Sequence, residues 1–572
     1  MMRSILKTLA PTMLLAALAA TSPVAMASAG AGDLEEARRL TWDQVTRDEG
    51  ITNLRNLLAG DSERLEVQEA LAEVLSWTHE TRPEAVELLR EVLARDSDRD
   101  HARLLLAEIL SWDREQRAES ERLYREQLQR QPDSIDARVG LARLLSWRGD
   151  MNRSQELYLE AIQRDPADPE ARMGLAEVQR WSGRSRTSLR TLRELDDQAR
   201  KLPGARRRLA ETWLALDRPA RALAEYVALL AENPNDEATR REIDKLRRRL
   251  RPSLELGVWA STESGDPRTS KVEALGFPVV WNWGSNGDWR YHAGAGAAFF
   301  DNAQGSTRRT SAGGGVEGPL GLRVRLRANA AVQDFQDGDS EFGGLLDVRV
   351  AAGERMEFVF GGRRRAVIDS RLAAAGETIS GVHYGPVYET AAFMGISAHP
   401  GNHWDLSVRG STGSLSGENI RDNDREALFA GFGRTFRSGR VGLRPAYSFT
   451  YLEYDLDLSG FPPDDLGGDG VTAPGAGGYF SPERFINHMA RLDLWWSHGE
   501  RASYFTGGGL GIQQVDDTGT QGLGSTTLSS DIYLGARWRL SPTVDLKARG
   551  SYQNVAAAFN RTRVELFLIR RF

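Results

Sequence analysis

The stretch Leu322-Arg323-Val324-Arg325-Leu326-Arg327-Ala328 alternates aliphatic and arginine side chains at every second position. Successive side chains of a β-strand point to opposite faces, so this stretch predicts a strand with one apolar and one charged face. Residues 531–540 and 544–552 repeat the pattern. Such strands suit a membrane barrel with an apolar outer face and a polar lumen. A soluble sheet with one buried face gives a similar pattern, and loop lengths distinguish the two.

The charged face of these three stretches predicts side chains that line the lumen of a barrel. They are Arg323, Arg325, Arg327, Asp531, Arg537, Asp545, Lys547 and Arg549.

Residues 252–572 predict an antiparallel transmembrane β-barrel of about sixteen strands. Every second connection is a tight turn, such as Pro319-Leu320 or Ser438-Gly439, and most others are longer and polar. This alternation is typical of outer-membrane barrels, and sixteen strands leave room for an aqueous channel. The candidate strands span residues 254–262, 271–283, 288–300, 307–318, 321–333, 341–351, 355–365, 384–398, 403–413, 423–437, 440–454, 484–498, 501–515, 525–540, 543–553 and 558–572.

Aromatic residues near the strand ends, such as Trp281, Trp283, Trp495 and Trp496, suit interfacial girdles. Ordinary strand preference for aromatic residues explains them equally well. The last strand ends on Phe572, which looks like the signal by which the bacterial outer-membrane assembly machinery recognises its substrates. Arg570 departs from the apolar residue usual two places before that end.

Residues 34–251 predict a helical repeat domain. The sequence Leu-Ala-Glu-Val-Leu-Ser-Trp at residues 71–77 recurs with small changes at 106–112, 141–147 and 175–181, and a degenerate copy lies at 209–213. A period of 34 or 35 residues is that of tetratricopeptide repeats. Each helix pair is amphipathic and cannot bury its apolar face alone, so neighbouring pairs must stack.

One tryptophan recurs at a fixed position of each repeat: Trp77, Trp112, Trp147 and Trp181. A fixed position favours packing between adjacent helix pairs, and a row of sugar-stacking platforms is the alternative. The basic run from Arg247 to Arg251 closes the last helix. It is either a favourable helix terminus or a contact with anionic lipid head groups.

The N-terminal residues predict a secretory signal, residues 1–27. Arg3 and Lys7 supply the positive region, an apolar run follows, and Ala25-Met26-Ala27 is a small-x-small cleavage site. The apolar run is shorter than the roughly 20 residues of a spanning helix, which disfavours a membrane anchor. The mature chain is therefore expected in the periplasm and the outer membrane.

The longest predicted loop, residues 455–483, is rich in Gly, Pro and Asp. Its end, Gly-Gly-Tyr-Phe-Ser-Pro-Glu-Arg-Phe at residues 477–485, resembles the hallmark of the outer-membrane C subunit of bacterial cellulose synthase. That family joins periplasmic tetratricopeptide-type repeats to a barrel that exports the polysaccharide. This sequence departs from the family in having a much shorter repeat region. The candidate exit residues on this loop are Asp464, Asp465, Asp469, Tyr479, Phe480 and Arg484. They are expected to constrict the exit and guide the polymer, and the alternative is that the motif only pins the loop to the barrel wall.

Little in the sequence indicates catalysis. The chain has no cysteine, its eight histidines form no His-Glu-x-x-His pair, and its net charge of -6 does not indicate nucleic-acid binding. A lipid-acting barrel enzyme would need a Ser/His pair at the membrane edge, for which His383, His399 and His488 are available. No cofactor or metal is expected.

The predicted fold class is multidomain α+β: an N-terminal α-helical tetratricopeptide-like solenoid followed by a C-terminal β-barrel. The resemblance implies passive, non-enzymatic export of a polysaccharide chain, cellulose or a related β-glucan, with repeats that contact synthase components and a barrel that contacts outer-membrane lipids. Two alternatives remain: a membrane-anchored repeat scaffold for protein assembly, and a solute porin with an adaptor domain.

Overall fold

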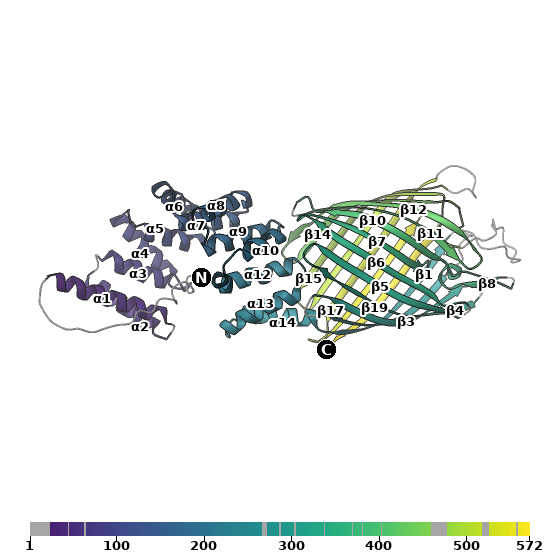
Figure 1. Cartoon of the computed structure of the whole chain (residues 1–572), viewed down its shortest axis with the longest axis horizontal. Coiled ribbons are helices and arrows are strands. Elements are labelled where there is room, and N and C mark those ends of the chain that lie inside the picture. Colours follow the sequence, from purple (N-terminus) through teal and green to yellow (C-terminus); the bar gives the residue numbers. More distant parts are fainter. Residues whose placement is uncertain are drawn as a thin grey trace. The chain divides into compact units, whose positions relative to one another are not determined.

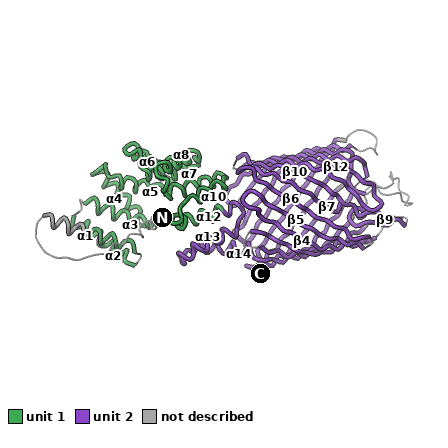
Figure 2. The backbone as a smooth tube through the Cα atoms, in the orientation of Figure 1, with its two compact units in different colours: residues 1–212 green, residues 213–572 purple. Residues whose placement is uncertain are grey.

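The computed structural model describes residues 23–572 except 44, 62–63, 266–271, 285–287, 303–304, 337, 369, 380, 402, 459–477, 517–524 and 556–558. Residues 1–22 of the expected signal sequence therefore lie outside the described residues. The chain divides into two compact units, residues 1–212 and 213–572, coloured separately in Figure 2. Each unit is built from its own class of secondary structure, apart from a helix pair that belongs to the second unit.

The first unit consists of helices in which consecutive members pack as pairs (Figure 1). The last of them, α12, crosses into the second unit. The helices are α1 (Pro23–Trp42), α2 (Arg47–Gly60), α3 (Leu65–Leu75), α4 (Arg82–Arg95), α5 (Asp100–Ser111), α6 (Arg117–Arg130), α7 (Ile135–Arg148), α8 (Met151–Arg164), α9 (Pro169–Trp181), α10 (Ser185–Arg193), α11 (Asp197–Lys201) and α12 (Pro203–Ala215).

The α7–α8 pair shows how local sequence sets the repeat. The side chain of Ser134 accepts a hydrogen bond from the amide of Ala137 at 3.3 Å and so caps the start of α7. Gly149 ends that helix with a φ of 90°, a conformation that glycine adopts at no steric cost. Between repeats, the ring of Tyr124 lies against Gly140, where a Cβ atom would overlap it. This close approach lets neighbouring pairs share one apolar core.

The second unit begins with the end of α12, contains the pair α13 (Pro219–Glu232) and α14 (Glu237–Leu250), and continues as strands with one short helix, α15 (Arg371–Ala375). The strands are β1 (Ser253–Gly265), β2 (Val272–Gly284), β3 (Arg290–Asn302), β4 (Gly305–Leu320), β5 (Val324–Phe335), β6 (Glu341–Ala352), β7 (Met356–Ala366), β8 (Glu377–Ile379), β9 (Val382–Tyr384), β10 (Tyr388–Ala398), β11 (Trp404–Gly417), β12 (Ile420–Arg434), β13 (Phe436–Ser438), β14 (Val441–Tyr454), β15 (Arg484–His498), β16 (Ala502–Asp516), β17 (Ser525–Arg539), β18 (Val544–Val555) and β19 (Phe559–Arg571).

The main sheet closes on itself, because β1 pairs antiparallel with both β2 and β19. The sheet has seventeen segments, but β12 and β13 both pair with β14 and are two parts of one strand. The prediction of sixteen strands, each antiparallel to its neighbours, is therefore confirmed. Only β8 and β9 lie outside this sheet among the described strands, as a small hairpin.

The predicted position of Arg323 within a strand is wrong. β4 continues to Leu320 and β5 begins at Val324, so Arg323 lies in the turn between them. Gly321 begins this turn with a φ of 90°, so the chain reverses at residues 321–323 and not at the Pro319-Leu320 pair.

Exposure alternates along the strands of the barrel. On β17, Leu528 is 79% exposed and Leu534 is 60% exposed, whereas Ser529 is buried and Tyr533 is partly covered. Because the wall is one sheet thick, the exposed apolar set faces outward and the alternate set faces inward. In the described part of the chain, no helix combines the length and the apolar character needed to span a membrane.

The aromatic residues expected in girdles divide between the two faces. Trp496 is exposed and stacks on Tyr504 of the neighbouring strand, with ring centroids 5.3 Å apart. Trp495, one residue earlier, lies on the opposite face, where its ring covers Gly442. A girdle role is therefore excluded for Trp495 and stays a prediction for Trp496.

Candidate functional site

The segment between β7 and β10, residues 367–387, does not form a simple loop. It contains α15 and the β8–β9 hairpin, and the residues from Leu372 to Ala375 are all buried. The side chain of Ser370 caps α15 by accepting a hydrogen bond from the amide of Ala373 at 3.1 Å. The amide of Val387 donates to the carbonyl of Ala373 at 2.9 Å and so ties the helix back to the start of β10.

One side of this segment packs against β3, β4 and β5. Ala374 and Ala375 share an apolar cluster with Phe300 and Phe335. Arg309 of β4 donates a hydrogen bond to the carbonyl of Ala374 at 3.1 Å. The segment therefore contacts wall strands that are separated from β7 by one or more intervening strands.

The other side packs against β11, β12 and β14. Leu372 shares a second apolar cluster with Leu415, Ile420 and Tyr454. A buried segment that touches both arcs of a closed wall must cross the barrel interior. We call residues 367–387 the cross-lumen segment.

The C-terminal end of the longest loop joins the same cluster. Tyr479 has no exposed surface and belongs to the same apolar cluster as Leu372 of the cross-lumen segment. Its hydroxyl lies 3.2 Å from the side-chain amide of Asn423. Asn423 also binds both the amide and the carbonyl of Leu456, at 2.9 and 2.7 Å. These contacts hold the two ends of the loop to the barrel.

Ser481 completes this attachment, since its hydroxyl accepts a hydrogen bond from the amide of Leu458 at 2.9 Å. Phe480 meets Phe485 edge to face, with ring centroids 5.4 Å apart. Arg484 is paired with Asp516 on the neighbouring strand. The structure thus brings Tyr479 and Phe480 to the barrel mouth. Asp464, Asp465 and Asp469 lie outside the described residues.

A charged cluster lies on strands next to the cross-lumen segment. Glu389 of β10 is buried and forms ion pairs with three arginines. The distances are 2.9 Å to Arg363, 2.7 Å to Arg365 and 2.6 Å to Arg425. A buried carboxylate is stabilised by several guanidinium partners, and it fixes β7, β10 and β12 to one another in return.

Most of the predicted lumen charges form ion pairs, and their partners are mainly other charged side chains of the second unit. Arg327 pairs with the buried Asp347, and Arg349 joins the same carboxylate at 3.3 Å. Asp531 pairs with Arg491, and Asp545 pairs with Arg537 and Arg571. Lys547 lies 5.7 Å from the ring of Phe567, and Arg549 lies 5.9 Å from the ring of Tyr533. Their role in lining a channel stays a prediction.

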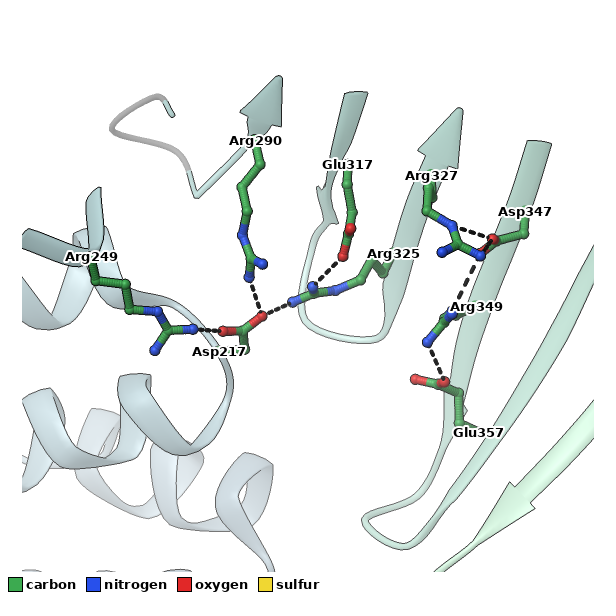
Figure 3. A network of polar contacts seen from close by, with 9 residues as sticks. All are labelled: Asp217, Arg249, Arg290, Glu317, Arg325, Arg327, Asp347, Arg349 and Glu357. Atoms are coloured by element: carbon green, nitrogen blue, oxygen red, sulfur yellow. Dashed lines mark hydrogen bonds and ion pairs between the residues drawn. The ribbon is translucent and has the colours of Figure 1, made fainter. Parts of the chain in front are cut away.

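Arg325 belongs to a network around Asp217, which follows α12 (Figure 3). Asp217 binds Arg249 of α14 at 2.5 Å, Arg290 of β3 at 2.6 Å and Arg325 of β5 at 2.7 Å. Burial raises the pKa of Asp217, but the hydrogen bond from Arg325 and the neighbouring positive charges outweigh it and hold the pKa below its ordinary value. The network joins the α13–α14 pair to the barrel.

The basic run before the barrel also contacts its turns. Arg249 binds Asp217, and Arg248 lies 3.9 Å from Glu500 in the β15–β16 turn. Neither the helix-terminus nor the lipid interpretation anticipates these partners. At the other end of the pair, Asp288 accepts a hydrogen bond from the backbone of Ala220.

The repeat tryptophans are not fully buried. Trp112 is 38% exposed, and Arg82 of α4 lies over its ring at 4.5 Å. The same Arg82 donates to the carbonyl of Ser76 at 3.1 Å. Arg47 over Trp77 and Arg117 over Trp147 repeat this contact. Trp181 lies under Arg180 of its own helix, at 5.9 Å. Each repeat tryptophan therefore packs against an arginine side chain, in addition to the predicted packing between helices.

The sequence predictions omitted the cross-lumen segment and the Glu389 cluster. A gap of eighteen residues between predicted strands 355–365 and 384–398 was the available signal, because a simple hairpin needs far fewer. Across the described residues, no three His, Asp or Glu side chains gather in a way that could hold a metal ion.

Two family models match the chain. The model described as the C-terminus of cellulose synthase operon protein C matches residues 315–523. A tetratricopeptide repeat model matches residues 111–178. No curated protein sequence matches the chain significantly. The first match runs from β4 to the end of β16 and so includes the cross-lumen segment, the Glu389 cluster and Tyr479.

Several solved structures are similar in part. A bacterial polysaccharide outer membrane secretin is 16% identical over 56% of this chain and 98% of its own, with a TM-score of 0.41. A tetratricopeptide repeat protein from Parabacteroides merdae is 18% identical over 37% of this chain and 82% of its own, with a TM-score of 0.34. Pseudomonas aeruginosa pilF is 14% identical over 39% of this chain and 99% of its own, with a TM-score of 0.30. The two family models, and not these structural similarities, are the basis for the functional proposal.

Proposed function

We propose that this chain exports a neutral β-linked glucan through the outer membrane, because residues 315–523 match the family model described as the C-terminus of cellulose synthase operon protein C and residues 111–178 match a tetratricopeptide repeat model. The barrel is the conduit, and the repeats are a periplasmic adaptor for the synthase components. The observation that carries the proposal is that the matched region coincides with the part of the barrel that holds the cross-lumen segment.

The balance of charge inside the barrel supports a neutral polymer. Asp347 is shared by Arg327 and Arg349, and Arg444 binds Asp405 at 2.5 Å and Asp493 at 2.9 Å. Channels that select ions do so with rings of one charge sign. Paired charges give no such ring and leave hydrogen-bonding groups that suit the hydroxyls of a sugar.

The cross-lumen segment and the loop held by Tyr479 form the constriction through which the chain leaves. Both are anchored by a shared apolar cluster, in which Leu372 and Tyr479 are fully buried. Export requires this constriction to open, or to leave a passage beside it for the polymer. The charged loop residues Asp464, Asp465 and Asp469 then guide the emerging polymer.

The two parts of the chain meet different partners. Outward side chains such as Leu528 contact outer-membrane lipid, and the repeat unit offers partly exposed tryptophans to the synthase components. The polymer is cellulose or a closely related β-glucan.

The test is deletion of the gene followed by assay of secreted polysaccharide and its sugar composition. We expect loss of a glucose polymer from the medium, restored by the full-length chain. Unchanged polymer secretion with reduced uptake of small solutes would instead identify a porin. A matched control is a chain that lacks residues 34–212, which keeps the barrel and removes only the first helical unit.

A further inference from the structure

Several aromatic rings of the barrel lie over a glycine of a neighbouring strand, and three inward ones lie in one sector of the wall. Each covers a glycine, at which a Cβ atom would overlap the ring. Because glycine has no side chain, each ring approaches the backbone of the neighbouring strand closely, and each ring is partly exposed on the lumen side. The pairs are Phe505 over Gly535, Tyr533 over Gly507 and Phe567 over Gly257.

Alternation along the strands places these rings inside. Tyr533 lies between Ile532 and Leu534, both exposed on the outer face of β17. Phe567 lies between Leu566 and Leu568, which are exposed on β19. Phe505 has the opposite parity to Leu510 and Ile512 of β16, which are also exposed.

The three rings occupy one sector of the wall, on strands that follow one another from β16 to β19. The ring centroids of Phe505 and Tyr533 are 6.1 Å apart. Between Tyr533 and Phe567 runs β18, whose Arg549 is opposite Gly535 on β17 and opposite Glu565 on β19. We call Phe505, Tyr533 and Phe567 the aromatic track.

Cations lie over two of the three rings, at longer distances than that of Arg563 over Trp259. Arg549 is 5.9 Å from the ring of Tyr533, and Lys547 is 5.7 Å from the ring of Phe567. Trp259 on β1 is different, because Arg563 lies 4.4 Å above its ring and shields that face. The sector thus combines partly exposed aromatic rings with hydrogen-bond donors close to them.

We propose that the aromatic track is a binding site for the pyranose rings of a β-linked glucan inside the lumen. The apolar face of each sugar stacks on a ring, and the equatorial hydroxyls accept hydrogen bonds from Arg549 and Lys547. Several weak, similar contacts hold an uncharged chain to the wall and still let it advance, since conduction needs sites that bind and also release. This inference rests on the proposed export function.

The competing explanation is that the rings only shield glycines, as aromatic residues do in other sheets. The two explanations differ in the surface that a bound sugar would contact. Replacing the rings by leucine keeps apolar cover over the glycines but removes the flat faces. A leucine variant therefore separates sugar binding from support of the wall.

The experiment measures cellohexaose binding by calorimetry to the full chain, folded in a detergent without a sugar head group. The variant carries Phe505→Leu, Tyr533→Leu and Phe567→Leu. We expect its Kd to be at least about tenfold weaker than that of the wild type, which corresponds to about 1.4 kcal/mol. The matched control is Tyr552→Leu on β18, an exposed ring on the outer face, whose Kd should stay within about twofold.

A second variant changes the glycine beneath a ring and leaves the ring itself unchanged. In Gly535→Ala the new methyl group displaces Phe505 from the wall, and we expect weaker binding although every ring is kept. Heat-modifiability in gels confirms that each variant is folded. If the wild type binds cellohexaose and the leucine variant binds it equally well, the aromatic track is refuted while export stands. If the folded wild type binds no oligosaccharide, both the track and the glucan assignment are refuted.

Discussion

The carboxylate of Asp288, in the β2–β3 connection, accepts a hydrogen bond at 2.7 Å from the backbone N–H of Ala220, near the start of helix α13. The first amides of a helix lack partners within the helix, and they are usually satisfied by a side chain just before it. Here the cap comes from a turn of the barrel. The last helix pair is therefore completed by the barrel, in agreement with its place in the second compact unit.

Asp288→Ala should loosen the start of α13. We expect a loss of about 1 kcal/mol in local stability, because that is the usual cost of removing a helix cap. Hydrogen exchange at the amides of residues 220–222 measures it. Asp150→Ala is the control, since Asp150 caps α8 within its own repeat and its loss should not alter exchange in α13.

The contact of the helix pair with the barrel should weaken in acid. The pKa of Asp217 lies below its ordinary value, so its ionised form is favoured in the folded protein. Such a group stabilises the fold above its unfolded-state pKa, and the stabilisation is lost as pH falls through the lowered folded-state pKa. Proteolysis of the residues around α13 should therefore accelerate only below about pH 4. Asp217→Asn should show the faster cleavage already at pH 7, and equal cleavage of both proteins at neutral pH would contradict this role.

Asn423→Ala should release the long loop from the barrel. The substitution removes the hydrogen bonds to Leu456 and the contact with the hydroxyl of Tyr479. We expect a higher single-channel conductance in planar bilayers without loss of folded barrel. Deletion of residues 464–475 should also raise the single-channel conductance.

Tyr479→Ala with Phe480→Ala should lower polymer export at an unchanged amount of folded barrel. Wild-type conductance and export in all of these variants would leave the loop with only an architectural role.

Trp147→Ala should destabilise the repeat unit by about 2–3 kcal/mol, somewhat below the loss for a fully buried tryptophan, because Trp147 is partly exposed. The loss includes the stacking of Arg117, 5.5 Å from the ring centre. Thermal unfolding of residues 34–212 measures it. Arg117→Ala is the companion variant and should cost less, because it keeps the ring. An unchanged melting temperature together with loss of sugar binding would favour the platform interpretation.

Sequence alone predicted most of the barrel, because strict alternation and short turns determine strand number and pairing. The limits appear at particular residues. Arg323 fits the alternation of its strand, yet the freedom of Gly321 moves the turn and takes Arg323 out of the sheet. The helix of the cross-lumen segment is only five residues long, too short to give a periodic signal.

The candidate site was predicted less completely. The resemblance indicates Tyr479, but nothing local in the sequence indicates that it shares an apolar cluster with Leu372, more than one hundred residues earlier. The Glu389 cluster joins residues of three strands, which only the register of the sheet brings together. In the repeats, Trp42 precedes Trp77 by the same 35 residues as the later copies, and this spacing was the overlooked signal for an earlier helix pair.

The pairing of β1 with β19 has a consequence for biogenesis. Ser253 and Arg571, which face each other across this seam, are separated by more than three hundred residues of chain. Contacts between such distant residues form slowly, because the entropy of closing the loop is lost before the contact is gained. The helical repeats contact only their neighbours and can fold as soon as they emerge. Until the seam closes, β1 presents an open hydrogen-bonding edge, so the unfinished barrel needs a protein partner that covers this edge during insertion.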